Sequence, residues 1–271
     1  MQTLATGTTG TIGQYLSRAV KPIKVDLSQG QKSFINIDIG GSDNLIHLAG
    51  IVGNELVCRN LEYAKLVNVR GTELLAKEFL KKSVGRFVYV SSCHVYADSS
   101  RIIDEEFKVE SSNEYTELKI AAERVLLEIF SNDMDRLLIL RPFSVLDWCQ
   151  KNNTLGGGIT RLACGDNSYN LENIDDVRDF LTPRTLAEII ELLSRASYVN
   201  GILNVCTGTP RSVKDAALEM FNDSGLTPPL HQFKQGVSNR PMIVGNSTKL
   251  EEIIQFKAKW TPSQFNSSDF A

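Results

Sequence analysis

The chain opens with a short apolar run that breaks into three glycines spaced three residues apart, in the segment LATGTTGTIG. Residues Thr3–Thr6 predict a buried strand, and Ile12–Ala19 carries apolar residues at helical spacing. Glycine at a strand-to-helix junction permits close backbone approaches that a side chain would block. The strand, the turn and the helix therefore predict a phosphate-binding bend at the edge of a parallel sheet.

Short apolar runs and helical patterns alternate as far as residue 205. The predicted strands are Thr3–Thr6, Ile23–Val25, Asn44–Ala49, Arg86–Ser91, Arg136–Arg141 and Ile202–Val205. The predicted helices are Ile12–Ala19, Tyr63–Leu80, Glu114–Phe130 and Thr185–Ala196. Such alternation indicates parallel strands joined by right-handed crossovers. The predicted fold class is α/β, a Rossmann-type doubly wound parallel sheet with a small C-terminal lobe.

The composition changes to loop-rich sequence near residue 146. We expect residues 1–145 to form the Rossmann domain, to which a strand and a helix around 178–206 return. Residues 146–177 and 207–271 are expected to form the smaller lobe, which would bind substrate.

Composition and charge exclude several classes of protein. The net charge of −3 and the lack of a Lys/Arg block argue against nucleic-acid or anionic-membrane binding. The apolar runs are too short to span a bilayer, and the start MQTLATG lacks the pattern of a secretory signal. Five scattered cysteines without CxxC spacing and three distant histidines predict reduced thiols, no metal site and a cytoplasmic location.

The three glycines have distinct expected roles toward a dinucleotide. Gly7 permits the tight turn, Gly10 lets the backbone approach a pyrophosphate, and Gly13 lets the helix pack against the sheet. Asp26 lies nineteen residues after Gly7, where a carboxylate can bind both hydroxyls of an adenosine ribose. That carboxylate would repel a 2′-phosphate, so NAD is expected rather than NADP. The alternative is an ordinary glycine-rich turn between a strand and a helix.

Nine motifs in register resemble the extended short-chain dehydrogenases/reductases, the group that contains the NAD-dependent nucleotide-sugar epimerases and dehydratases. The first is TGTTGTIG, whose Gly-x-x-Gly-x-x-Gly spacing is typical of that group. The others are LIHLAG (45–50), NVRGTELL (68–75), FVYVSSCHVY (87–96), YTELKIAAE (115–123), LRPFSV (140–145), RDFLTPRTLAEII (178–190), LNVCTGTPRSV (203–213) and FKAKWTP (256–262).

In the segment YTELK, the four-residue spacing places Tyr115 and Lys119 on one helix face. A free tyrosine has a pKa near ~10, and a nearby ammonium and an oxidised nicotinamide would favour its phenolate. The resemblance implies that Tyr115 is the acid/base while hydride passes between a sugar carbon and NAD. It also implies that Lys119 binds the nicotinamide ribose and that Ser92 bonds the substrate oxygen. Without the resemblance, Tyr115 and Lys119 would be an ordinary solvated pair.

The resemblance implies further cofactor contacts from the opening turn and from the ends of later strands. These residues are Thr9, Thr11, Ile12, Leu48, Ala49, Gly50, Asn68, Pro142 and Phe143. Asn68 resembles an asparagine that ties a helix to the sheet near the cofactor. We interpret His47, inside an apolar strand, as a core residue rather than a catalyst.

Several positions depart from the family pattern. Cys93 and His94 stand where sugar 4,6-dehydratases have Asp-Glu, so a standard 4,6-dehydratase is not expected. His94 would face the substrate, either as a second acid/base or as a hydrogen-bonding wall residue. Arg240 resembles an arginine that grips a nucleotide diphosphate, although it could equally be an exposed structural arginine. Pro22 is expected to end the first helix early.

The leading expectation is an NAD-dependent nucleotide-sugar 4-epimerase that keeps its cofactor. One alternative is an NAD(P)H-dependent reductase or epimerase-reductase, and a third is a dinucleotide-binding regulator without turnover. The resemblance also implies a homodimer in which Tyr63–Leu80 and Glu114–Phe130 form a four-helix bundle with their copies.

Overall fold

The computed structural model describes residues 2–23, 37–41, 43–148, 150, 154–236, 238 and 240–265. Its centre is a six-stranded sheet with the order β2-β1-β3-β4-β5-β9, and every neighbouring pair is parallel. The strands are β1 (Thr3–Thr6), β2 (Val20–Pro22), β3 (Asn44–His47), β4 (Phe87–Val90), β5 (Leu137–Pro142) and β9 (Gly201–Val205). The predicted doubly wound α/β fold is confirmed.

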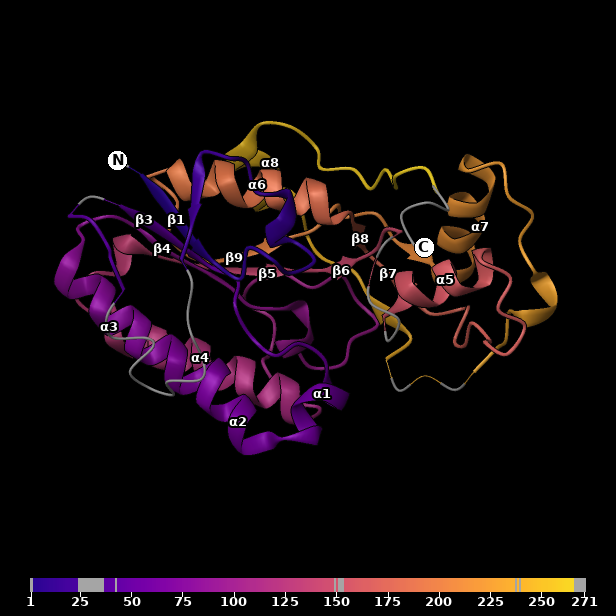
Figure 1. Cartoon of the computed structure of the whole chain (residues 1–271), viewed down its shortest axis with the longest axis horizontal. Helices are drawn as coiled ribbons and strands as arrows, with labels where there is room; N and C mark the ends of the chain where they lie inside the picture. Colours follow the sequence, from indigo (N-terminus) through magenta and orange to yellow (C-terminus); the bar gives the residue numbers. More distant parts are fainter. Residues whose placement is uncertain are drawn as a thin grey trace.

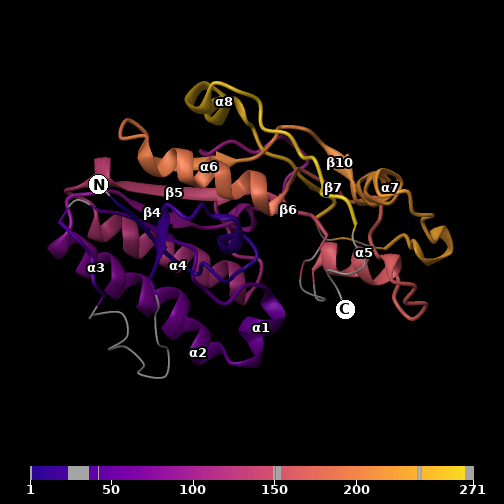
Figure 2. The same ribbon diagram turned by 45° about the horizontal axis from the view of Figure 1, so that its top comes forward.

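Helices cover both faces of this sheet (Figures 1 and 2). One face carries α2 (Leu61–Lys65), α3 (Thr72–Lys82) and α4 (Glu114–Ile129), and the other carries α6 (Pro183–Arg195) and α8 (Thr248–Ile254). Adjacent strand residues point to opposite faces, so Leu45 packs toward α3 and α4 while Ile46 packs toward α6. The central strands are therefore buried on both sides, as in other covered parallel sheets.

The segment after β1 differs from the prediction. The expected helix Ile12–Ala19 is wrong, because only a 3₁₀ turn forms there, at Gly13–Tyr15. The second strand begins at Val20, three residues before the expected Ile23, and Pro22 ends that strand rather than a helix. Only six residues separate Gly13 from Val20, which leaves too little chain for two helical turns and a connection.

The predicted helix Tyr63–Leu80 is present in three pieces. A π-helix at Leu66–Gly71 joins α2 to α3. Thr72 follows it directly, and its hydroxyl donates to the carbonyl of Asn68 at 2.8 Å. Single π turns inside helices are frequent at functional sites.

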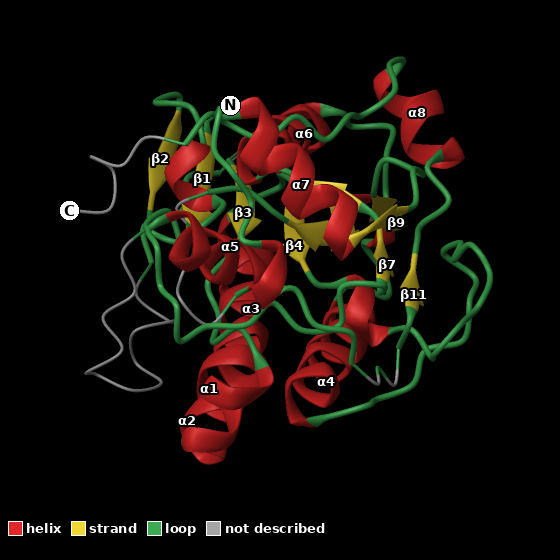
Figure 3. Cartoon of the chain, turned by 90° about the vertical axis from the view of Figure 1, so that its right-hand side faces the viewer, coloured by secondary structure: helices red, strands yellow, loops and turns green. Residues whose placement is uncertain are grey.

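A smaller group of elements packs beside the carboxyl end of the sheet (Figure 3). It comprises β6 (Ser144–Val145), α5 (Leu155–Ala163), β7 (Val177–Arg178), β8 (Phe180–Leu181), β10 (Arg211–Ser212), α7 (Val213–Asp223) and β11 (Met242–Ile243). Asp179 links this group to the main sheet, since its buried carboxylate accepts backbone N–H bonds from Thr207, Gly208 and Gly245. The expected division into two lobes stays a prediction.

Three further findings apply to the described part of the chain. None of its helices is both long enough and apolar enough to span a membrane. No group of His, Cys, Asp and Glu side chains in it is placed to hold a metal ion. Its four cysteines are free thiols, and Cys93 and Cys206 are buried.

Candidate active site

The opening turn is shaped so that two of its glycines cannot carry a side chain. Gly7 has φ of +72°, and a Cβ there would lie 2.6 Å from the backbone nitrogen of Ala49. A Cβ on Gly13 would overlap the carbonyl oxygen of Gly7, whereas one on Gly10 would meet only that oxygen, at 3.2 Å. Gly7 therefore lets the turn touch the loop after β3, and Gly13 lets the turn close on itself.

The turn is braced by α6 rather than continued by a helix of its own. The hydroxyl of Ser17 donates to Glu191 Oε2 at 2.7 Å, and the guanidinium of Arg184 lies 5.1 Å from the ring centre of Tyr15. The predicted helix Ile12–Ala19 would have directed its positive dipole end at a diphosphate, and the observed 3₁₀ turn of three residues has little dipole. The close backbone approaches at the glycines still fit a diphosphate.

The loop after β3 joins the turn to the π-helix. Asn68 donates to the carbonyl of Ile51 at 2.8 Å and accepts from its N–H at 2.7 Å. Gly50 lies against the same side chain, because a Cβ there would be 3.2 Å from Asn68 Oδ1. The structure therefore brings Gly7, Ala49, Gly50 and Asn68 together, and their contact with a cofactor stays a prediction.

The N-terminal end of α4 positions Tyr115. Asn113 and Thr116 form a reciprocal capping box, with bonds of 3.0 and 3.1 Å. The N–H of Tyr115 donates to Asn54 Oδ1 at 3.3 Å, which docks α4 against α1 (Asn54–Arg59). These caps fix the first turn of α4, and with it the direction of the Tyr115 phenol.

Ser92, Tyr115 and Lys119 lie together at the carboxyl end of β4. All three are buried, with exposed fractions of 7%, 9% and 6%. Lys119 Nζ donates to the carbonyl of Val90 at 2.9 Å and to Tyr89 Oη at 3.3 Å. Ser92 is hydrogen-bonded to Tyr115 and also accepts the N–H of His94, at 3.2 Å. The three side chains share one buried site, with hydroxyls from a strand end and a helix.

Burial shifts the protonation equilibria of this site. Burial raises the pKa of Tyr115 to about 12, and the hydrogen bond with Ser92 only partly opposes that rise. Burial lowers the pKa of Lys119 to about 8, although the Glu123 carboxylate works against it. Burial therefore sets the direction of the phenol pKa in the protein without its cofactor, and the expected effect of the ammonium together with an oxidised nicotinamide stays a prediction. Near neutral pH both groups hold their protons.

Replacing Lys119 by methionine should change how stability depends on pH. A lysine whose pKa is lowered on folding destabilises the fold below its folded pKa, and this penalty disappears as pH rises from about 8 to 10.5. The full penalty is about 3 kcal/mol. We expect the free energy of unfolding of wild type, relative to Lys119→Met, to rise over that window. Urea unfolding from pH 7 to pH 10.5 measures it, and a difference that stays constant with pH would contradict the shift.

Two arginines meet His94 on the side of the site away from the turn. Arg240 Nη1 lies 3.4 Å from His94 Nδ1, and its Nη2 donates to the carbonyl of Tyr96 at 2.8 Å. Burial, followed by the charges of Arg240 and Arg178, lowers the pKa of His94 to about 4. His94 is therefore neutral near pH 7, which weakens it as a proton donor and favours the hydrogen-bonding wall.

Arg240 is neither fully exposed nor free. It forms an ion pair with Asp98 at 2.6 Å, and Arg178 forms one with Asp176 at 2.6 Å. Both guanidinium side chains are mostly buried, at 13% and 16% exposure. Two guanidinium groups on one wall of the site can still donate hydrogen bonds to the oxygens of an anion.

The sequence reasoning missed three residues of this site. Arg178 is in the RDFL motif but was not assigned a role, and Asn54 carries no sequence signal for its contact with α4. Glu123 lies four residues after Lys119, a spacing that places both side chains on one face of the helix. Its buried carboxylate forms a two-pronged ion pair with Arg141, at 2.6 and 3.1 Å.

The remaining predicted residues fall in three places. Pro142 ends β5 and Phe143 follows it; both are buried, and Phe143 packs in one cluster with Cys93 and Cys206. Leu48 follows β3, and Thr9, Thr11 and Ile12 belong to the opening turn. Asp26 lies outside the described residues. The expected preference for NAD over NADP, which rests on Asp26, therefore stays a prediction.

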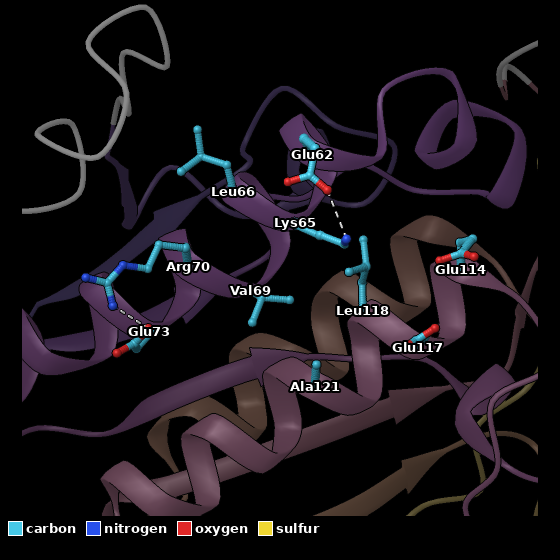
Figure 4. Close-up of a pocket in the computed structure, with 10 residues that line it drawn as sticks. All are labelled: Glu62, Lys65, Leu66, Val69, Arg70, Glu73, Glu114, Glu117, Leu118 and Ala121. Carbon is cyan, nitrogen blue, oxygen red and sulfur yellow. Dashed lines mark hydrogen bonds and ion pairs between the residues drawn. The ribbon is translucent and has the colours of Figure 1, made fainter.

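A separate groove of about 500 Å³ lies between α2, the π-helix and α4 (Figure 4). Charged and apolar residues line it, and none of the proposed catalytic side chains does. The lining residues are Glu62, Lys65, Leu66, Val69, Arg70, Glu73, Glu114, Glu117, Leu118 and Ala121.

Comparisons with known proteins agree with the fold class and with the family resemblance of the motifs. Residues 3–206 match the model of the NAD dependent epimerase/dehydratase family. The chain is 30% identical over 192 residues to GDP-6-deoxy-D-mannose reductase of Pseudomonas aeruginosa, covering 67% of this chain and 62% of that protein. It is 26% identical over 230 residues to GDP-6-deoxy-D-talose 4-dehydrogenase of Aggregatibacter actinomycetemcomitans, covering 79% of this chain and 76% of that one.

The fold also superposes on solved structures. RMD from Pseudomonas aeruginosa, in complex with NADPH, matches with a TM-score of 0.81 at 23% identity, over 96% of this chain and 93% of that one. At that identity the likeness establishes the fold.

Proposed function

The chain belongs to the NAD-dependent epimerase/dehydratase family, and from that premise we propose that it is a reductase of nucleotide-diphosphate hexoses that carry a keto group. The observation that supports this choice is the buried, hydrogen-bonded pair of Ser92 and Tyr115, which places two hydroxyl groups where a carbonyl oxygen could accept hydrogen bonds. Burial raises the pKa of Tyr115 to about 12, so near neutral pH the phenol holds the proton that a carbonyl oxygen needs when it becomes a hydroxyl. Both curated relatives are, by name, net redox enzymes of GDP-6-deoxyhexoses, so a GDP sugar is the first candidate.

The cofactor fits the residues that the structure places around the opening turn. Gly7, Ala49, Gly50 and Asn68 would hold it, and Gly10, where an added Cβ would meet only the carbonyl oxygen of Gly7, leaves room for a close approach. When bound, the nicotinamide supplies two electrons to the sugar carbon or removes them from it.

The chain's own groups act on the oxygen of that carbon. Ser92 and the Tyr115 phenol donate hydrogen bonds to it, and Tyr115 gives up its proton as the oxygen gains negative charge. The Lys119 ammonium stabilises the phenolate that remains, since opposite charges in a buried site interact strongly. Near neutral pH His94 is uncharged and orients the sugar by hydrogen bonding.

A substrate panel tests this proposal. The protein is incubated with keto and hydroxyl forms of GDP-, dTDP- and UDP-hexoses and with NADH or NADPH. A reductase consumes one equivalent of reduced cofactor per sugar. The 4-epimerase expected from the sequence would change the sugar at constant cofactor absorbance, and a regulator would bind dinucleotide without turnover. Either of those results would contradict the proposal.

Arg178 and Arg240 are proposed to bind the diphosphate of the substrate. Losing one charge-assisted contact costs about 1.5–3 kcal/mol, so Arg178→Gln should raise the KM for the nucleotide sugar about 10–100-fold. The kcat should change much less, because the diphosphate is remote from the reacting carbon. Arg161→Gln is the matched control, since Arg161 is also paired with a carboxylate, Asp166. Steady-state kinetics that show equal KM values for both variants would contradict this role.

A homodimer through α2–α3 and α4 is part of the proposal. The groove between these helices offers partly exposed Leu66, Val69 and Ala121 among charges of both signs, which suits a self-complementary face. Sedimentation at micromolar concentration should give a dimer, and Val69→Glu should shift it to monomer. A wild-type monomer would contradict this arrangement.

A further inference from the structure

A continuous chain of hydrogen bonds runs through the buried imidazole of His47. Its Nδ1 lies 2.7 Å from Oγ1 of Thr6, which is the last residue of β1. Its Nε2 lies 2.9 Å from Oγ1 of Thr72, which is the first residue of α3. Thr6 Oγ1 also receives the N–H of Ala49 at 3.3 Å, and Thr72 donates to the carbonyl of Asn68 at 2.8 Å. All four side chains are at most 3% exposed.

These contacts define which nitrogen of His47 carries the proton. The single hydroxyl proton of Thr72 goes to the carbonyl of Asn68, so toward His47 its oxygen can only accept. His47 Nε2 must therefore be the N–H, and the unprotonated Nδ1 accepts the hydroxyl proton of Thr6. Burial, followed by the charge of Lys119, lowers the pKa of His47 to about 3, so the ring stays neutral. Every donor in this series of hydrogen bonds through His47 therefore has one acceptor.

The two ends of this chain lie beside the groups proposed to hold the cofactor. Thr6 immediately precedes Gly7, whose backbone touches Ala49, and Asn68 anchors the loop at Gly50 and Ile51. We propose that His47 is a positioning residue for the dinucleotide: as the Nε2–H tautomer it sets the opening turn, the loop after β3 and Asn68 in the arrangement that binds the cofactor. This inference rests on the proposed cofactor site and adds to it a residue that does not touch the cofactor.

Replacing His47 tests the inference through cofactor affinity. Phenylalanine fills the same space against Phe87 and Tyr89 but offers no partner to either threonine. Thr6 would then lose the acceptor for its hydroxyl proton and Thr72 would lose the donor from Nε2, which should weaken NAD(H) binding about tenfold or more, measured as the dissociation constant by titration. His47→Asn keeps an acceptor near Nδ1, so it should restore part of the affinity. The kcat at saturating cofactor should fall far less than the affinity.

Two controls separate positioning from general loss of stability. Phe130→Leu disturbs the same core at a distance from the turn, so it should lower the melting temperature without changing the cofactor dissociation constant. Thr72→Val should weaken cofactor binding in wild type but add little in His47→Phe, since both changes break one chain.

The outcomes distinguish this inference from the proposed function. If His47→Phe binds NAD(H) as wild type does while losing stability like Phe130→Leu, His47 is only a core residue and the inference fails. A ¹⁵N spectrum of wild type that shows protonated Nδ1 would also overturn it, whether or not the variants fold. Wild type that binds no dinucleotide would instead overturn the proposed cofactor site.

Discussion

Tyr115→Phe should lower kcat about 10²–10⁴-fold and leave the dissociation constant for NAD(H) unchanged. The substitution removes only the phenol oxygen, which the proposal makes the proton donor to the substrate. The ring continues to pack with Val57, Ala64 and Leu118, so the fold and the cofactor site keep their contacts. Single-turnover kinetics with the keto sugar and reduced cofactor measure the loss directly.

The matched control for this prediction is Tyr89→Phe. Tyr89 is also buried and its hydroxyl lies 3.3 Å from Lys119 Nζ, but it is not assigned to the substrate oxygen. Because Lys119 holds its proton near neutral pH, this bond is charge-assisted and its loss costs about 1.5–3 kcal/mol, mainly of stability. Tyr89 does not contact the substrate oxygen in this proposal, so kcat should fall less than about tenfold. If Tyr115→Phe retained wild-type turnover, or if both variants lost activity equally, Tyr115 would not be the proton donor.

Gly13→Ala should abolish measurable cofactor binding, with a loss of more than about 100-fold in affinity. The added methyl group would overlap the carbonyl of Gly7, so the turn must open, which costs about 1–3 kcal/mol of stability as well. Gly7→Ala should act similarly, because its φ of +72° disfavours a side chain and its Cβ would press on Ala49. Equilibrium dialysis with NAD(H) and thermal unfolding give the two quantities.

Other glycines of the chain provide the controls. Gly225 has φ of +68° and open space around it, so Gly225→Ala reproduces the strain of Gly7→Ala without the crowding and should leave cofactor binding intact. Gly10→Ala should fold normally, since its Cβ meets a single atom at 3.2 Å, yet bind cofactor weakly if the diphosphate approaches there. Folded Gly7→Ala and Gly13→Ala proteins with wild-type affinity would show that the turn does not hold the cofactor.

The sequence predicted correctly those strands and helices whose apolar pattern matches their burial in the fold. The apolar strand Thr3–Thr6 matches β1, and the periodic helix Glu114–Phe130 matches α4 to within one residue. It failed after the glycine turn, where apolar residues at helical spacing are present but the chain length before β2 is too short for a helix. It also missed the π-helix at Leu66–Gly71, because one wider turn inside a helix leaves no apolar period of its own in the sequence.

The sequence predicted which residues belong to the candidate site more fully than it predicted their electrostatic environment. The spacing of Tyr115 and Lys119 placed both on one face of α4, and the structure buries both beside Ser92. Burial itself could not be read from that spacing, and it raises the pKa of Tyr115. Arg178 approaches His94 only through long-range packing, because Arg178 lies on β7 whereas His94 follows β4, and no local pattern records that approach.

A crystal structure of the protein with NAD(H) and a GDP sugar tests the central claim most directly. We predict that the cofactor diphosphate lies against the Gly7–Gly13 turn. We also predict that the Tyr115 oxygen lies within hydrogen-bond distance of the oxygen on the sugar carbon that changes oxidation state. A cofactor bound elsewhere, or a phenol pointing away from that oxygen, would contradict the account.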